Sequence, residues 1–158
     1  MSGAKEILSS LGTALGTAFP TYAIVYNAPI DGTYTGAGKW LKVHMMEEDA
    51  SLQSQNVLGG KELVSPILSV SISQPIVGAD TPESLARAGE LWDLAGSLRA
   101  AIFAWIIGTR SAPITGNITL SYLRFSTVPA ALDLGATSGT ETVTVQTYVT
   151  YTRNAGAA

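Results

Sequence analysis

The 158-residue chain has no cysteine, a single histidine and few charged residues. Without cysteine it has no disulfide, no thiolate nucleophile and no cysteine-based zinc or iron–sulfur site. Charged residues make up 13% of the chain, against about 25% in an ordinary soluble domain. The nine Lys and Arg residues form no basic cluster, which disfavours sequence-specific binding of nucleic acid. The composition therefore favours an assembly subunit whose uncharged surface lies against other protein.

A long hydrophobic run is also missing. The longest apolar segment, residues 100–107, lies between Arg99 and Arg110 and is far shorter than the roughly 18–20 residues of a membrane span. We expect it to be a buried helical segment, with no membrane partner. Hydrophobic residues nevertheless make up 46% of the chain, which excludes disorder for most of it. The length predicts one domain, residues 1–153, followed by a flexible tail, residues 154–158.

Hydrophobic periodicity predicts two helices. Apolar residues spaced three and four apart predict an amphipathic helix over residues 4–19, which its two glycines weaken. Thr81, Pro82 and Glu83 form a strong start signal for a second helix of about 26 residues that ends at Gly108. Its apolar stripe includes Trp92 and Trp105, and both are predicted to lie in the core.

Period-two alternation predicts the strands. They cover residues 22–27, 39–46, 68–73, 118–123 and 143–152. The third strand could extend back to Leu63, but Pro66 would then require a sheet edge or a bulge. The order is helix, three strands, long helix, two strands. It predicts an α+β fold with a mainly antiparallel sheet of four to five strands, packed by the N-terminal helix and the long helix.

One strand carries a candidate interface. Along residues 39–46, Trp40, Lys42 and His44 alternate with Leu41 and Val43, so the first three share one face of the strand. An aromatic residue on the face away from the core is a candidate contact for a neighbouring subunit.

The segment after this strand, residues 47–60, has no periodicity and is predicted to be a long loop that contacts a neighbour. Its candidate contacts are Leu52, Gln53 and Gln55. It opens with the only acidic cluster, Glu47, Glu48 and Asp49. This cluster is either a solvated loop start or the lining of a channel.

Catalytic and cofactor motifs are missing. His44 beside the three acids could suggest a metal site or a general base, but the chain has no second histidine and no cysteine to complete a metal site. No nucleophile elbow, dinucleotide fingerprint or phosphate loop is present. We therefore expect neither an enzyme nor a cofactor.

The element order resembles the tail terminator, or tail completion, proteins of long-tailed bacteriophages. The residues that carry the resemblance are the Lys39-Trp40-Leu41-Lys42-Val43 strand, the strand that leads to Pro75 and Gly78, and the helix opening Thr81-Pro82-Glu83-Ser84-Leu85-Ala86. The segment between the last two strands, rich in Ser, Gly and Ala, departs from the family pattern.

This resemblance implies a virion protein, made in the host cytoplasm and located at the neck of the tail. Members form a ring, commonly of six subunits, which ends the growth of the tail tube and joins tail to head without catalysis. The implied partners are other copies of the chain, the tail tube protein and the head–tail connector protein, while DNA passes through the channel without specific binding. The alternatives are a tail tube or head-completion (connector) subunit, and a small-ligand binding module with an apolar pocket near Trp92 and Trp105.

Overall fold

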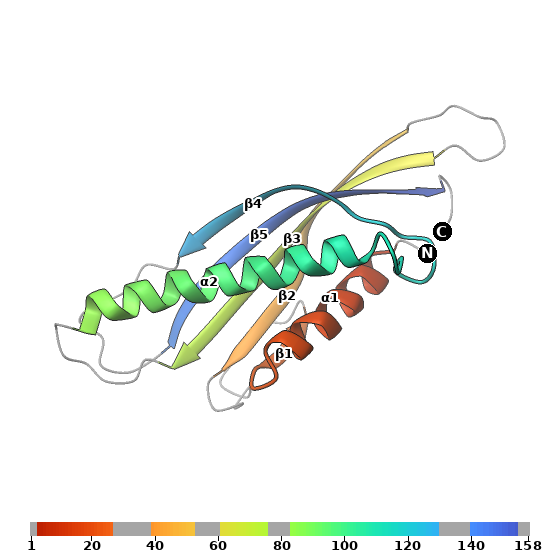
Figure 1. The fold of residues 1–158 in the computed structure, drawn as a ribbon. Coiled ribbons are helices and arrows are strands. Elements are labelled where there is room, and N and C mark those ends of the chain that lie inside the picture. Colours follow the sequence, from red (N-terminus) through yellow and green to blue (C-terminus); the bar gives the residue numbers. More distant parts are fainter. Residues whose placement is uncertain (1–2, 27–38, 53–60, 76–82, 130–139, 155–158) are drawn as a thin grey trace.

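The structure is a computed structural model that describes residues 3–26, 39–52, 61–75, 83–129 and 140–154. Its order, two helices and five strands, is the order that the sequence predicts (Figure 1). The elements are α1 (Ala4–Ala18), β1 (Ala23–Tyr26), β2 (Trp40–Leu52), β3 (Lys61–Pro75), α2 (Glu83–Gly108), β4 (Ser121–Pro129) and β5 (Thr140–Asn154). The α+β class is thus confirmed, and the two predicted helices have nearly the predicted bounds.

The five strands form one sheet in the order β1-β2-β3-β5-β4. β1 pairs with β2 in parallel, whereas the other three pairs are antiparallel. The sheet is therefore mixed, although it is mainly antiparallel as predicted. Parallel neighbours need a long connection, and residues 27–39 separate β1 from β2.

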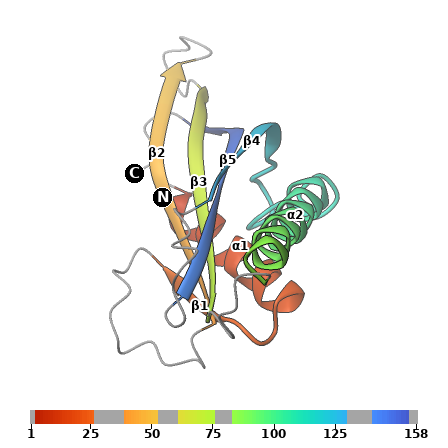
Figure 2. The same ribbon diagram turned by 90° about the vertical axis from the view of Figure 1, so that its left-hand side faces the viewer.

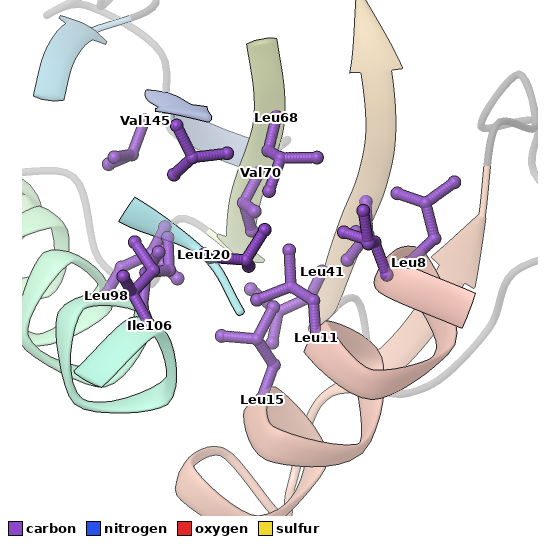
Figure 3. Packing of buried hydrophobic residues seen from close by; sticks show 14 of the residues in the cluster. Leu8, Leu11, Leu15, Leu41, Leu68, Val70, Leu98, Ile106, Leu120 and Val145 are labelled. Atoms are coloured by element: carbon purple, nitrogen blue, oxygen red, sulfur yellow. The ribbon is translucent and has the colours of Figure 1, made fainter. Parts of the chain in front are cut away.

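Both helices pack on the same face of the sheet (Figure 2). On α1 the fully buried residues Ile7, Leu11 and Leu15 recur every four positions, and on α2 the buried stripe contains Leu98, Ile102 and Ile106. These residues meet the alternate strand residues that point to the helices, and Figure 3 shows this packing. The strand residues are Leu41, Val43, Leu68, Val70, Ile72, Val143 and Val145.

Irregular pairing marks the middle of the sheet. Between the pairs Met45↔Leu68 and Glu47↔Ile67, β2 contains one extra residue. β4 likewise contains one extra residue, Leu123, between its pairs with β5. Pro66 lies next to the β2 irregularity, where no β3–β5 pair is formed by residues 65 and 66. The prediction that Pro66 requires an edge or a bulge is therefore met by the irregularity, because proline has no N–H to donate to a ladder.

Several strand bounds differ from the predictions. β2 continues to Leu52, so the predicted loop is wrong for residues 47–52, which form part of a β-ladder with β3. β4 begins at Ser121, later than predicted, and Ile118 instead forms an isolated bridge with Ile114. Asn154 belongs to β5 rather than to a tail. The rest of the predicted tail lies outside the described residues. The end of each strand is set by where its pairing with a neighbouring strand stops, and hydrophobic alternation within one strand does not predict that position.

Candidate subunit interface

The sheet face opposite the helices, called here the helix-free face, holds the predicted β2 contacts. Trp40, Lys42 and His44 lie on it together, because Leu41 and Val43 between them are buried against the helices. All three are half-buried. Their β3 partners are Ser73, Ser71 and Ser69, which in turn pair with Thr142, Thr144 and Gln146 of β5.

Hydroxyl groups bond to one another at the centre of this face. Ser71 and Thr144 share a hydrogen bond of 2.8 Å between their hydroxyl oxygens, and the Thr142 hydroxyl donates to the Ser73 hydroxyl at 3.1 Å. Hydroxyl groups that are hydrogen-bonded to each other within the sheet lose less hydration free energy on burial than charged side chains do. The β3 and β5 positions of the helix-free face are consequently polar but uncharged. Ser69 and Ser73 are already buried, and another protein can cover the half-buried positions beside them at a small desolvation cost.

A cation–π pair lies at the β4 side of the same face. The Arg124 guanidinium lies 4.1 Å from the centre of the Tyr148 ring, and the Tyr148 hydroxyl donates to the Gln146 side-chain oxygen at 3.4 Å. Sequence reasoning missed this pair because the extra residue Leu123 sets which face Arg124 occupies. Arg and Tyr are both enriched in protein interfaces.

His44 has the electrostatics of a neutral imidazole. Burial, and then the positive charge of Lys42, lower its pKa below the ordinary value of 6.5. Its Nδ1 atom is buried and has no hydrogen-bond partner among the described residues. Nor do the described residues contain any group of three or more His, Cys, Asp and Glu that could hold a metal ion. The His44 ring is thus a half-buried group of the helix-free face whose neutral form is favoured.

The remaining predicted contacts lie further along the same strand. Glu47, Glu48 and Asp49 pair with Ile67, Pro66 and Ser65, so they are strand positions. Leu52 is the last residue of β2. Gln53 and Gln55 lie outside the described residues. A strand of this length spans about 40 Å at 3.3 Å per residue, and the β2–β3 end reaches past both helices in Figure 1.

Exposed apolar side chains form a second surface on the helix side. The Phe103 ring of α2 meets the Tyr122 ring of β4 edge-on, with 5.4 Å between ring centres. Phe103 is 43% exposed and Ile107 is 38% exposed. The prediction of a buried segment over residues 100–107 is wrong for these two residues and for Ala100 and Ala104, which are also exposed, since a helix on a sheet buries only one of its faces.

The two α2 tryptophans have different environments. Trp92 is 50% exposed, so its predicted core position is wrong. It precedes by one turn the first described buried residue of the helix, Ala95. Trp105 packs against the core and donates its indole N–H to the Ser10 hydroxyl of α1 at 2.9 Å. Thirteen residues separate the two indoles, about 20 Å along a helix, so they do not line one small pocket.

A recess of about 500 Å³ lies elsewhere, between α1 and residues 112–115. It is open to solvent, and Lys5, Glu6 and Ser9 are among the residues that line it. Neither tryptophan contributes to it. The predicted apolar pocket near the tryptophans therefore has no counterpart in this recess.

Comparisons with known proteins add little about function. No protein-family model and no curated protein matches the chain. One solved structure, 15% identical in sequence, aligns over 93% of this chain and 91% of its own with a TM-score of 0.48. That likeness carries no functional argument, and the name of the solved protein states no activity. In the part of the chain that is described, neither helix has the length and hydropathy that crossing a membrane would require.

Proposed function

We propose that the chain is a structural, non-enzymatic ring subunit at the head-proximal end of a phage-like tail. The observation that carries this proposal is the helix-free face. A solvated sheet face normally carries many charged side chains, whereas the described part of this one presents Trp40, Tyr148 and a set of paired hydroxyls, with the charges of Lys42 and Arg124 toward its two sides. Such a composition supports contact with another protein.

The element order supports the choice of a tail terminator ring among assembly proteins. The order of the two helices and five strands is the order that resembles the tail terminator proteins. In this proposal the ring, commonly of six copies, ends the growth of the tail tube. It binds the tube protein on one side and the head–tail connector on the other. The protein then resides in the virion, at the neck of the tail.

The acidic stretch of β2 has a role in the same proposal. In this proposal the segment of β2 that carries Glu47, Glu48 and Asp49 borders the channel, where its negative charge discourages binding of the DNA that passes through. Replacing all three with Lys should slow genome delivery and leave ring formation intact. Wild-type infectivity of that triple variant would contradict the channel assignment.

Alternative functions make different predictions. A tail tube subunit should polymerise alone into long tubes, whereas a terminator should stop at one ring. A head-completion subunit should be found on the head before the tail joins. A small-ligand binding module should retain a bound molecule in native mass spectrometry, but no described feature favours it.

Light scattering and negative-stain imaging of the purified protein test the proposal. Ser71→Arg places a charge at the centre of the helix-free face and should abolish rings while circular dichroism remains that of the wild type. Thr13→Arg, at an exposed position of α1, is the matched control and should leave rings intact. Monomers alone at high concentration, together with a tagged copy that never enters particles, would refute the ring.

A further inference from the structure

The outer face of α2 carries a regular repeat that the core does not use. Six residues follow one another at spacings of three and four: Asp93, Gly96, Ala100, Phe103, Ile107 and Arg110. Spacings that alternate between three and four repeat every seven residues, which is the heptad repeat of a coiled-coil contact line. We call these six residues the α2 seam.

The seam lies on the exposed side of α2, at the edge of which Phe103 contacts the Tyr122 ring of β4. Ala100, Phe103 and Ile107 are exposed and Gly96 is half-exposed, whereas Leu98 and Ile102 of the opposite stripe are fully buried. Arg110 follows the end of the helix, but its backbone N–H donates to the Ile107 carbonyl at 3.1 Å, so the chain continues the turn. Between residues 96 and 107, α2 thus has two apolar faces, and the described residues bury only one of them. A helix that is apolar on both faces is normally covered on both.

The side-chain sizes along the seam complement those of a second seam that runs in the opposite direction. The contact line of a coiled coil alternates between two heptad positions, a and d. In an antiparallel pair, an a position of one helix lies level with a d position of the other. An antiparallel second copy, centred between residues 101 and 102, sets Phe103 against Ala100 and Ile107 against Gly96. Each large side chain then meets a small one. A parallel partner would instead set Phe103 against Phe103 and leave a gap between the two Gly96 positions.

Charge selects the same arrangement. The seam has an acid, Asp93, at one end and a base, Arg110, at the other, and both are exposed. In the antiparallel arrangement each Asp93 lies level with an Arg110, so opposite charges meet at both ends of the contact. A parallel arrangement would bring like charges together at each end. Size and charge therefore agree on the orientation.

We propose that the α2 seam binds the α2 seam of a second copy, antiparallel about a two-fold axis. Because each large side chain of the seam then faces a small one, the helix axes can approach to about 8–10 Å. The exposed Tyr122 ring against Phe103 flanks this contact. A two-fold contact closes after two copies, whereas a ring needs a head-to-tail contact. The seam is thus a surface distinct from the helix-free face proposed for the ring.

Cysteine cross-linking tests the orientation, since the natural chain has no cysteine that could interfere. In the proposed dimer, residue 100 of one copy lies across the two-fold axis from residue 100 of the other, with an offset of about 4.5 Å along the helices. Ala100→Cys should form a disulfide-linked dimer on oxidation. Position 93 lies about 26 Å from its own copy along the axis, too far for a disulfide. Asp93→Cys alone and Arg110→Cys alone should stay unlinked, while a mixture of the two should cross-link.

Self-linking of Asp93→Cys would overturn the antiparallel orientation. No link in either the Ala100→Cys protein or the mixture would overturn the contact itself. Circular dichroism of each variant establishes that it is folded, which the exposed positions lead us to expect.

Charge reversal gives a second, independent measurement by sedimentation at low ionic strength. Asp93→Arg alone, or Arg110→Asp alone, should weaken the dimer about tenfold, because each creates two like-charge pairs. The double variant should restore dimerisation. Lys5→Glu, an exposed reversal on α1, is the control and should leave the dimer unchanged. Failure of the double variant to recover would refute the predicted charge pairs.

Ala100→Glu separates this inference from the ring. It should abolish the two-fold dimer and leave rings intact, whereas Ser71→Arg should do the reverse. A dimer that persists in Ala100→Glu refutes the seam and leaves the ring proposal standing.

Discussion

The two glycines inside α1 provide a matched pair for testing how the helix is held. Gly12 is buried, and a Cβ atom added to it would overlap the Tyr26 ring of β1. Gly16 lies one turn later, and a Cβ atom there would meet nothing within 4 Å. The same substitution, Gly to Ala, therefore probes helix propensity alone at one site and propensity plus a close contact at the other.

The expected effects have opposite signs. Gly16→Ala should raise the free energy of unfolding by up to about 1 kcal/mol, because alanine loses less backbone entropy in a helix. For a chain of this size that gain corresponds to about 2–4 °C in Tm. Gly12→Ala gains the same propensity but must displace the Tyr26 ring. Overpacking of this kind costs about 1–3 kcal/mol, so the net change should lie between zero and a loss of about 2 kcal/mol.

Urea and thermal unfolding, followed by circular dichroism, measure both variants. The decisive background is Tyr26→Ala, which removes the obstructing ring; Tyr26 is 44% exposed, so this change alone should be tolerated. In that background Gly12→Ala should become stabilising by about 1 kcal/mol. Equal stabilisation by Gly12→Ala and Gly16→Ala in the natural background would refute the argument that Gly12 is needed for close approach of α1 to β1.

Three further perturbations have definite expected outcomes. The pKa of His44 lies below 6.5 in the folded state, so the unfolded chain binds more protons between that lowered pKa and pH 7. Stability should therefore fall as the pH drops from 7 toward the folded pKa. Profiles of Tm against pH should show a smaller fall for His44→Gln. Ser10→Ala should cost about 1–3 kcal/mol, because it leaves the half-buried Trp105 N–H without its acceptor; in a Trp105→Phe background the same change should cost much less by urea unfolding. Ile102→Ala, at a fully buried position, should cost about 2–5 kcal/mol in chemical denaturation, and a loss below 1 kcal/mol would contradict its place in the core.

Local periodicity predicted the elements whose burial is one-sided. α1 and α2 have the expected bounds because their apolar residues recur at helical spacing. The placement of Trp40, Lys42 and His44 on one face also follows from the period of a strand. These features depend only on residues near one another in the sequence.

Features that depend on distant partners could not be predicted in this way. Glu47 to Leu52 have no strand pattern, yet they join β2 because β3 offers a matching ladder. The Arg124–Tyr148 pair depends on the extra residue in β4, which only the register with β5 reveals. Trp92 fits the helical stripe but precedes the first described buried residue of α2. Sequence spacing says which face of an element is apolar, but not how far its neighbour extends.

The position of β5 between β3 and β4 has a consequence for how the chain folds during synthesis. β2 and β3 are close in sequence and can pair early, whereas the β3–β5 ladder joins residues such as Ser71 and Thr144, which are 73 positions apart. At about 5–20 residues per second, β3 waits on the order of 4–15 s on the ribosome before its second partner emerges. During that interval one edge of a long strand is open to other nascent chains. Pro66 donates no N–H and lies where the ladder is interrupted, so another chain could not pair continuously along that edge, which is a feature that disfavours edge-to-edge aggregation.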